Sequence, residues 1–394
     1  MSGLVPLGEA CELVTDGTHF TPTNVGKGLP FLTVKDVSDS GLDFVNCSFI
    51  SDDDYQAARE GNSAPQRGDV LFSKDGTVGK VHVVTTDRPF AVLSSLAILR
   101  PIHGEVDAAY LGHALRSPQV LDDALRKKTG SAIRRIVLAD LKRVNVPLPS
   151  LPEQRRIAEV LDRAEALRAK RRAALAHLDT LTQSIFLDIF GGAGGSEMGW
   201  PLSELGALCE RVIDCPHSTP VYADGPTKYP CVRTSDIQNG ELVLSTTKYV
   251  EKAEYDVRVA RGRPCAGDVI YCREGARFGN AARLPSGVSI CLGQRMMLFR
   301  AREDLAVGEY LWAFLLSGPG LRQAMGAVAG SASPHVNIED LIAFRVPRPP
   351  LPLQREFARR VRVVDKMKAV ERRCLEETES LFSALQHRAF RGQL

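Results

Sequence analysis

The chain has 394 residues, a net charge of +3 and 25% charged residues, a composition typical of a globular protein with two or three domains. It contains no apolar run long enough for a membrane span. It also lacks a basic stretch followed by an apolar one at its start. We therefore expect a cytoplasmic protein without membrane contact, whose nine cysteines are reduced thiols.

A first globular domain is predicted over residues 1–146 and a second over residues 193–346. The two resemble one another weakly, through short motifs that recur in the same order. The clearest matched pairs are Asp16 to Pro22 with Asp214 to Pro220, Phe31 to Val37 with Cys231 to Ile237, and Gly68 to Gly76 with Gly267 to Gly275.

Both domains are expected to be mixed α/β. The Gly-Asp segments read as turns that lead into short strands, Val70–Phe72 and Val269–Tyr271. Apolar spacing predicts helices from Tyr110 to Lys127 and from Tyr310 to Met325.

Each domain is followed by a long helical segment, residues 147–192 and 347–394. The two segments align without a gap, with Pro147 opposite Pro347 and Phe190 opposite Phe390. Each opens with a Pro-rich entry and then continues without Pro or Gly for nearly forty residues, about 58 Å of helix. Such a length is typical of a coiled coil. A repeat spaced by half the chain indicates a protein built twice.

The apolar positions of both helices alternate in steps of three and four, as a coiled-coil seam does. The predicted seam consists of Ile157, Val160, Ala164, Leu167, Ala174, Leu178, Leu181 and Ile185 with Phe357, Val364, Met367, Cys374, Leu381 and Leu385. The alternative is two unrelated amphipathic helices, each packed on its own domain.

Antiparallel packing of the two helices makes specific predictions about neighbours. It places Ile157 near Leu385, Ala164 near Thr378, Leu178 near Val364, and Ile185 near Phe357. It also brings together the two midpoints, where Arg171 and Glu371 interrupt the seam with opposite charges. We expect them to pair, although long charged side chains at a seam edge can also turn to water.

The chain carries none of the common catalytic motifs: no phosphate-binding glycine loop, metalloprotease motif, nucleophile elbow or amino-methyltransferase motif. We therefore expect a protein that is not an enzyme. The nearest approach to a metal pattern is Cys209, Cys215 and His217, whose spacing is not that of a zinc site. His19 and His217 recur at matched places and are interpreted as turn or contact residues.

The order of domain, helix, domain, helix resembles the specificity subunit of a type I restriction-modification system. The residues that carry the resemblance are Val146 to Gln154 running into Ile157 to Leu161, the Gly-Asp-Val turns at 68 and 267, and the Gly-Ser segments at 130 and 330. The second helix departs from the pattern, with Leu353 before Gln354 where the first has Glu153.

The resemblance implies an α+β fold: two target recognition domains separated by two long helices that form an antiparallel coiled coil with a pseudo-twofold repeat. Each domain would read one half of a bipartite site on double-stranded DNA. The coiled coil would set the spacing and dock two methylation subunits, with restriction subunits in the full complex. S-adenosylmethionine, ATP and magnesium would be bound by those partners and not by this chain.

Candidate DNA contacts are basic and amide side chains, because Arg and Lys bind phosphates or guanine edges and Asn or Gln binds adenine. They are Lys35, Lys74, Arg134 and Arg135 in the first domain and Arg233, Arg273, Arg277, Gln294, Arg295 and Asn337 in the second. Each could instead be a solvated surface group.

Two other functions remain open on the residues alone. The chain could be a scaffold whose two domains bind protein and not DNA. It could also be the recognition part of a single-chain methyltransferase and nuclease, which would require a methyltransferase motif that this sequence lacks.

Overall fold

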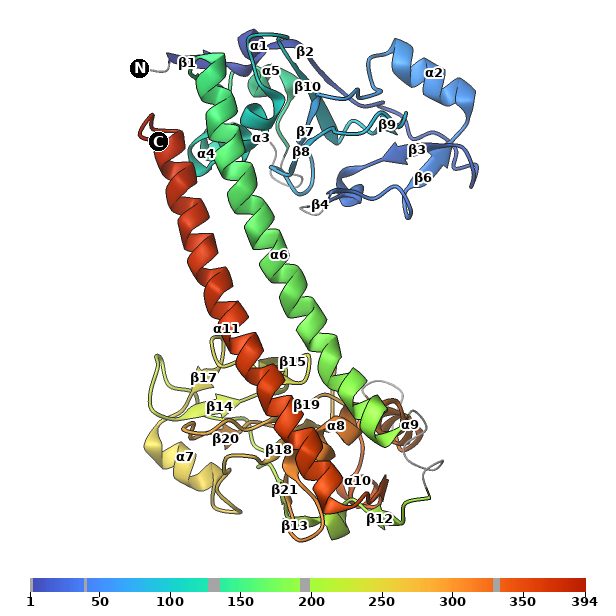
Figure 1. Cartoon of the computed structure of the whole chain (residues 1–394), viewed down its shortest axis with the longest axis vertical. Coiled ribbons are helices and arrows are strands. Elements are labelled where there is room, and N and C mark those ends of the chain that lie inside the picture. Colours follow the sequence, from blue (N-terminus) through green and yellow to red (C-terminus); the bar gives the residue numbers. More distant parts are fainter. Residues whose placement is uncertain (1–2, 39–40, 127–134, 192–198, 329–333) are drawn as a thin grey trace. The chain divides into compact units, whose positions relative to one another are not determined.

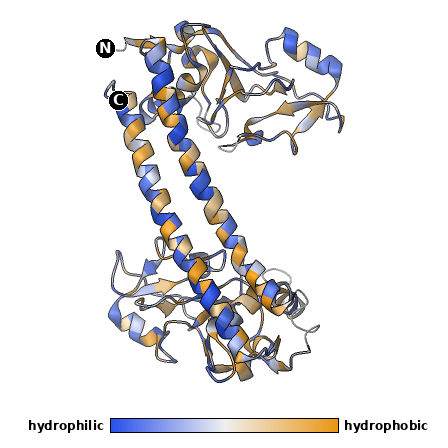
Figure 2. Ribbon diagram, viewed as in Figure 1, coloured by the Kyte–Doolittle hydropathy of each residue, from blue (hydrophilic) through white to orange (hydrophobic). Residues whose placement is uncertain are grey.

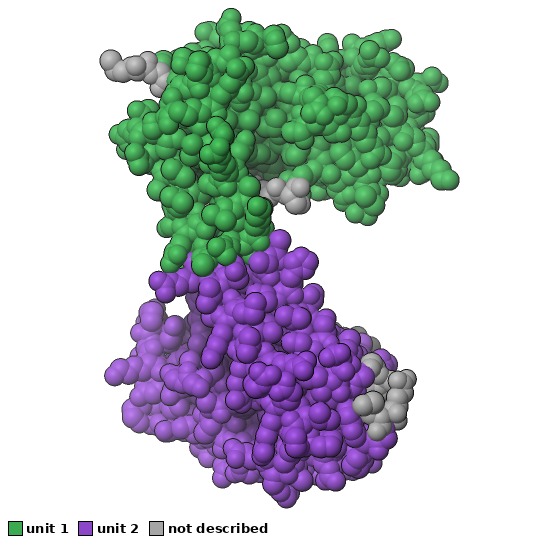
Figure 3. All heavy atoms as spheres, viewed as in Figure 1, with its two compact units in different colours: residues 1–171, 374–394 green, residues 172–373 purple. Residues whose placement is uncertain are grey.

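The computed structural model describes residues 3–38, 41–126, 135–191, 199–328 and 334–394. They group into two compact units (Figure 3), Met1–Arg171 with Cys374–Leu394 and Arg172–Arg373. Each compact unit therefore holds one globular domain and half of each long helix. Within the described residues, no helix is both long enough and apolar enough to span a bilayer.

The first globular domain is built on a four-stranded antiparallel sheet in the order β2-β10-β7-β8 (Figure 1). Smaller sheets have the orders β1-β11, β6-β3-β9 and β4-β5. The strands are β1 Gly3–Pro6, β2 Cys11–Asp16, β3 Leu29–Leu32, β4 Val37–Ser38, β5 Gly41–Leu42, β6 Ser48–Ile50, β7 Val70–Ser73, β8 Val81–Val83, β9 Ala91–Val92, β10 Leu96–Pro101 and β11 Asn145–Leu148. The helices are α1 Leu7–Ala10, η1 Val34–Asp36, α2 Asp52–Glu60, α3 Ala108–Arg116, α4 Pro118–Arg126 and α5 Leu138–Leu141.

The second globular domain repeats this architecture, with a four-stranded sheet in the order β13-β21-β18-β19 and smaller sheets β12-β22, β17-β14-β20 and β15-β16. Its strands are β12 Leu202–Glu204, β13 Cys209–Asp214, β14 Pro230–Val232, β15 Ile237–Gln238, β16 Glu241–Leu242, β17 Lys248–Tyr249, β18 Val269–Cys272, β19 Ala281–Arg283, β20 Cys291–Leu292, β21 Met296–Ala301 and β22 Arg345–Pro347. Its helices are η3 Gly206–Leu208, η4 Thr234–Asp236, α7 Lys252–Arg258, α8 Gly308–Leu316, α9 Gly318–Gly326 and α10 Ile338–Ile342. The mixed α and β content and the strands predicted after the Gly-Asp turns are confirmed.

Both faces of each four-stranded sheet are buried. In the second domain, alternate residues of β18 enter different clusters: Val269 and Tyr271 pack with α8, whereas Ile270 and Cys272 pack on the side that contains Val232 of β14. Successive side chains of a strand point to opposite faces, so one strand supplies both cores. This explains why β7 and β18 read as continuous apolar runs.

The prediction of a single helix after each sheet is wrong, because each domain has two shorter helices there. The breaks fall at Ser117 and Ser317, which separate α3 from α4 and α8 from α9. Each serine hydroxyl bonds back to a carbonyl, Ala114 O at 2.6 Å and Phe314 O at 2.6 Å. Such local hydroxyl bonds compete with the helical backbone and favour the start of a new helix.

The two long helices, α6 Leu151–Phe190 and α11 Leu351–Ala389, are antiparallel, as predicted. In the first compact unit, the start of α6 packs on the end of α11, since Ile157 shares a cluster with Phe382 and Leu385. In the second compact unit, the end of α6 packs on the start of α11, since Ile185 shares a cluster with Phe357. The pairing of Arg171 with Glu371 stays a prediction.

The predicted seam is shifted by one residue at alternate positions. Leu161, Arg168 and Thr182 lie inward, whereas Leu167 and Leu181 are 40% and 38% exposed. The same shift in α11 leaves Met367 and Leu381 exposed. Apolarity alone misplaced these positions, because Arg168 is accommodated inside by stacking on Phe382, with its guanidinium carbon 4.5 Å from the ring centroid. An outward apolar stripe therefore remains on both long helices, and Figure 2 shows apolar residues along them.

Each long helix is anchored to the domain before it by a buried glutamine at the equivalent position. Gln154 Oε1 accepts from Asp107 N, and its Nε2 donates to Glu105 O and Pro149 O, over 2.8–2.9 Å. Gln354 repeats this with Val307 N, Leu305 O and Pro349 O, over 2.9–3.1 Å. A tyrosine hydroxyl completes each junction at 2.6 Å, Tyr110 to Pro147 O and Tyr310 to Pro347 O.

Replacing Gln154 with Ala is expected to loosen the first junction by about 2–4 kcal/mol, because it leaves buried backbone groups without partners. Hydrogen exchange of the α3 amides should accelerate correspondingly, while the second domain stays unchanged. The neighbouring exposed Arg155 is the control, since its replacement with Ala should change stability by less than about 0.5 kcal/mol. Unchanged α3 exchange in the Gln154→Ala chain would contradict the anchoring role.

Candidate DNA-binding surface

In each globular domain, an aspartate at the end of the first sheet strand pairs with a cation from the loop after β7 or β18. Asp16 Oδ2 lies 3.1 Å from Lys74 Nζ, and Asp214 Oδ1 lies 3.5 Å from Arg273 Nε. Both cations, predicted as DNA contacts, are buried, with exposed fractions of 7% and 8%. A buried charge needs its partner, so these pairs first of all hold the domain together.

A histidine three residues further on binds the same aspartate. His19 Nε2 is 3.2 Å from Asp16 Oδ1, and His217 Nε2 is 2.9 Å from Asp214 Oδ2. The histidine side chains are 78% and 65% exposed. The prediction omitted both aspartates. Their signal in the sequence was the recurrence of Asp-x-x-His in both domains.

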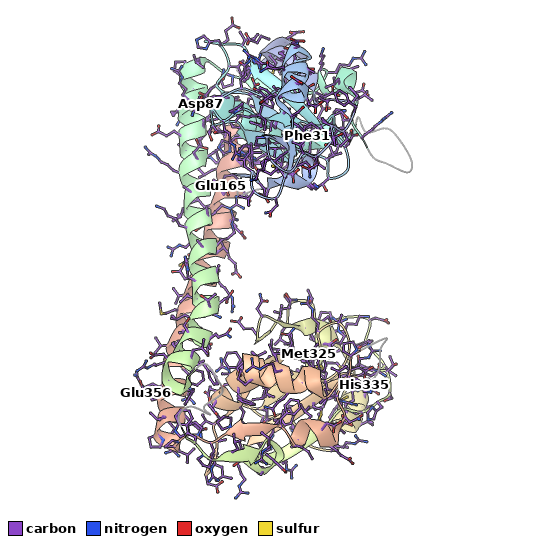
Figure 4. The ribbon with its side chains drawn as sticks, turned by 90° about the vertical axis from the view of Figure 1, so that its right-hand side faces the viewer. Phe31, Asp87, Glu165, Met325, His335 and Glu356 are labelled. Carbon is purple, nitrogen blue, oxygen red and sulfur yellow. The ribbon has the colours of Figure 1, made fainter. Side chains whose placement is uncertain are left out.

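The loop after β7 or β18 meets a second segment from late in each domain. Ile136 N donates to Lys74 O over 2.9 Å, and Val336 N donates to Arg273 O over 3.1 Å. The residue before each donor forms an isolated bridge, Arg135 with Asp75 and His335 with Glu274. Figure 4 shows His335 on the side of the second domain away from the long helices. Arg135 is exposed, and Arg134 lies outside the described residues.

Lys35 and Arg233 belong to another matched turn. Lys35 is exposed within η1, whereas Arg233 closes η4 by donating from Nη2 to Asp236 Oδ1 over 2.8 Å and to Thr246 O over 2.9 Å. Asp236 is fully buried, and its hydrogen bond raises the pKa of Arg233 above the ordinary value. Arg233 therefore has a structural role, and its contact with DNA stays a prediction.

The remaining candidates lie in the second domain. Gln294 donates from Nε2 to His217 O over 2.6 Å, and Asn337 donates from Nδ2 to Asp340 Oδ2 over 3.4 Å at the start of α10. Arg295 is half-exposed, and its Nε lies 3.4 Å from Glu274 Oε1. Arg277 is exposed in the loop between β18 and β19. The structure thus brings Arg273, Gln294 and Arg295 together around the His217 and Glu274 loops.

The cysteine and histidine pattern noted in the sequence does not form a cluster. Cys209 and Cys215 are buried, whereas His217 is exposed and binds Asp214. Across the residues that the structure describes, no three His, Cys, Asp or Glu side chains are grouped as metal ligands. This surface presents cationic and amide side chains on exposed loops. Such side chains bind the phosphates and bases of a nucleic acid and do not need to react with it.

Comparison with known proteins gives a consistent result. The "Putative type I restriction enzyme MjaX specificity subunit" of Methanocaldococcus jannaschii is 21% identical over 98% of this chain and 92% of its own length. The "Type I restriction enzyme EcoBI specificity subunit" of Escherichia coli is 28% identical over 43% of this chain, but this alignment spans only 36% of that protein.

Two solved structures share the fold over nearly the whole chain. The "type-I restriction-modification system S subunit from M. genitalium" superposes with a TM-score of 0.61 at 15% identity, covering 99% of this chain and 96% of that one. A chain from a study of complex assembly and conformational transition of the type I R-M system has a TM-score of 0.57 at 18% identity, covering 100% and 98%.

The model of the type I restriction modification DNA specificity domain matches residues 4–177 and again residues 200–380. Each match contains one globular domain and most of the long helix that follows it. Because the two matches together cover most of the sequence, this chain belongs to the type I restriction-modification DNA specificity family and carries its domain twice.

Proposed function

We propose that this chain is the DNA-binding specificity subunit of a type I restriction-modification complex, in which each globular domain reads one half of an interrupted site. One observation carries this proposal. The two domains share their fold and their anchoring contacts, yet differ in the exposed side chains that they present at matched positions. Ser95 of the first domain corresponds to Arg295 of the second, and the exposed Lys35 corresponds to Ser235.

That combination suits two readers of one duplex. A bipartite site has the same backbone in both halves but a different base sequence in each. Two domains that share a frame but differ in their exposed groups can bind similar backbones and read different bases. A scaffold with two protein-binding domains gives no reason for cations and amides to gather beside matched loops.

The outward apolar stripe on the long helices supports partner binding. Leu167 and Met367 are matched positions, as are Leu181 and Leu381, and all four are more than one-third exposed. The first compact unit holds Leu167 and Leu381, and the second holds Leu181 and Met367. In the second unit, Leu178, Leu181 and Met367 line a groove of about 470 Å³. Two equivalent apolar patches fit two equivalent partners, which we take to be two methylation subunits.

In this proposal the partner subunits carry out the methylation and cleavage reactions. We infer that the chain itself is not catalytic, and that methylation and restriction subunits bind S-adenosylmethionine, ATP and magnesium. Its contribution is to select the DNA site and hold the partners there. Assembly with such subunits on DNA would place it in the cytoplasm.

The proposal predicts salt-sensitive, sequence-specific binding to duplex DNA. The full chain, co-expressed with its methylation subunit, should select an interrupted site from randomised duplexes. With six to ten phosphate contacts, the affinity should fall by about 10³ to 10⁵ between 50 and 200 mM salt, because bound cations are released from the DNA. Binding that depended neither on sequence nor on salt would instead support a protein scaffold.

A further inference from the structure

Arg295 occupies a position that the two domains hold in the same way but fill differently. Arg273 N donates to Arg295 O over 3.2 Å, as Lys74 N donates to Ser95 O over 2.9 Å. The loops before β21 and β10 therefore share this backbone hydrogen bond. They differ in the side chain, and also in the backbone of that residue, because Arg295 has a positive φ and Ser95 does not. The hydroxyl oxygen of Ser95 is buried, whereas the Arg295 side chain is 54% exposed.

The backbone of Arg295 is unusual for its residue type. Its φ is 68°, in the left-handed region that a side chain with a Cβ rarely adopts outside turns and functional sites. The guanidinium lies against Gly275, where an added Cβ would come 3.5 Å from Arg295 Nη1. Gly275 itself has a φ of 88°. The glycine loop thus leaves room for a guanidinium presented at the surface.

The partner of Arg295 orients it without holding it firmly. Nε lies 3.4 Å from Glu274 Oε1, and the two side chains are 54% and 32% exposed. A pair at this exposure contributes little to stability, so the guanidinium can exchange it for DNA. Two other cations of this surface are less available: Arg273 is buried and paired with Asp214, and Arg233 is bonded to Asp236.

The neighbouring groups indicate which base pair would suit the site. Arginine binds the O6 and N7 of guanine with two hydrogen bonds, and a glutamate can accept from the N4 of cytosine. Gln294, the residue that would suit adenine, already donates one amide hydrogen to His217 O over 2.6 Å. Arginine beside glutamate therefore favours a G·C pair in the major groove.

We propose that Arg295, oriented by Glu274, is a specificity-determining residue that reads a guanine in the half-site of the second domain. This rests on the proposed function. The first domain has Ser95 at this position and lacks the equivalent fork there.

The test compares three variants of the full chain, each assembled with its methylation subunit and offered randomised duplexes. Arg295→Gly removes the side chain and suits the positive φ, so the loop can keep its shape. Arg295→Lys keeps the charge but loses the planar fork. Arg302→Ala is the matched control, because Arg302 is 50% exposed, is paired with Asp304 at 3.2 Å, and lies at the opposite end of β21.

We expect the wild type to prefer guanine at one position of the second half-site. Arg295→Gly should reduce that preference by about tenfold to a hundredfold, and Arg295→Lys should lose most of it. Arg302→Ala should retain it. The preference for the first half-site should persist in every variant, which shows within the same molecule that the chain is folded and assembled.

The opposite results are equally distinct. If Arg295→Gly weakened binding to all sequences alike and Arg295→Lys restored it, Arg295 would contact a phosphate and the guanine assignment would be wrong. The assignment would also be wrong if Arg295→Gly selected the wild-type site unchanged. A wild-type complex that selected no interrupted site at all would contradict the proposed function itself.

Discussion

Replacing residues 1–146 with the chain's own residues 198–346 should convert an asymmetric recognition site into a palindromic one. The altered chain would carry the second globular domain twice, once before each long helix. Both half-sites should then have the sequence now read by the second domain, in opposite orientations. The loss of the original site should be complete, because no first domain remains to read its half.

The junctions make this exchange feasible within one chain. Gln154 and Gln354 form the same three hydrogen bonds to the domains before them, and Tyr110 and Tyr310 bond to the equivalent prolines. A transplanted second domain would bring Leu305, Val307 and Tyr310 to the helix that now receives the first domain's equivalents. The buried polar groups at the new junction would keep their partners.

Sequencing of the methylated positions in genomic DNA would read the outcome. The reciprocal chain, with residues 1–146 in both places, is the matched control and should give the other palindrome. An altered complex that still methylated the original asymmetric site would show that specificity does not reside in the exchanged domains.

The internal repeat and the antiparallel contact of the long helices were predictable, because both depend on residues that recur in the two halves of the sequence. The recurrence of Asp-x-x-His and of the Gly-Asp-Val turns predicted two domains with the same plan, and the Pro-rich entries predicted where the long helices start. The antiparallel contact of Ile157 with the Leu385 region followed from matching the two helices end to end, and the structure confirms it.

Other features depend on contacts that a one-dimensional pattern does not contain. From Ala164, the residues three and four positions further along the helix both lie close to the same face. Apolarity therefore selected Leu167, whereas the packed residue is Arg168. The stacking of Arg168 on Phe382, which lies 214 residues further along the chain, is a tertiary contact. Likewise, charge alone could not separate Arg273, which is buried against Asp214, from the exposed Arg295.

The second large effect is expected from lengthening both long helices by one heptad. Residues 165–171 and 371–377 are the blocks that face one another in the predicted antiparallel seam. Duplicating both blocks repeats every neighbour in the seam and adds about 10 Å to each helix. If the helices set the distance between the two half-sites, the preferred spacer should lengthen by about three base pairs.

The control inserts seven residues into the glycine-rich joint at residues 191–196, where the chain grows but neither helix does. That chain should keep the original spacer. A chain with the heptad in only one helix should assemble poorly, because its seam residues no longer face their partners. An unchanged spacer in an active complex with both heptads would contradict the idea that the helices act as a ruler.

The same insertion should also slow methylation, because distance and rotation do not change together. Three base pairs turn the second half-site by about 100° around the DNA axis, whereas a heptad shifts the helical seam by only about 20°. The second domain would reach its half-site only if the DNA untwisted or the domain reoriented, and either deformation costs free energy. A longer preferred spacer with a reduced methylation rate is therefore the specific result that a rigid antiparallel coiled coil predicts.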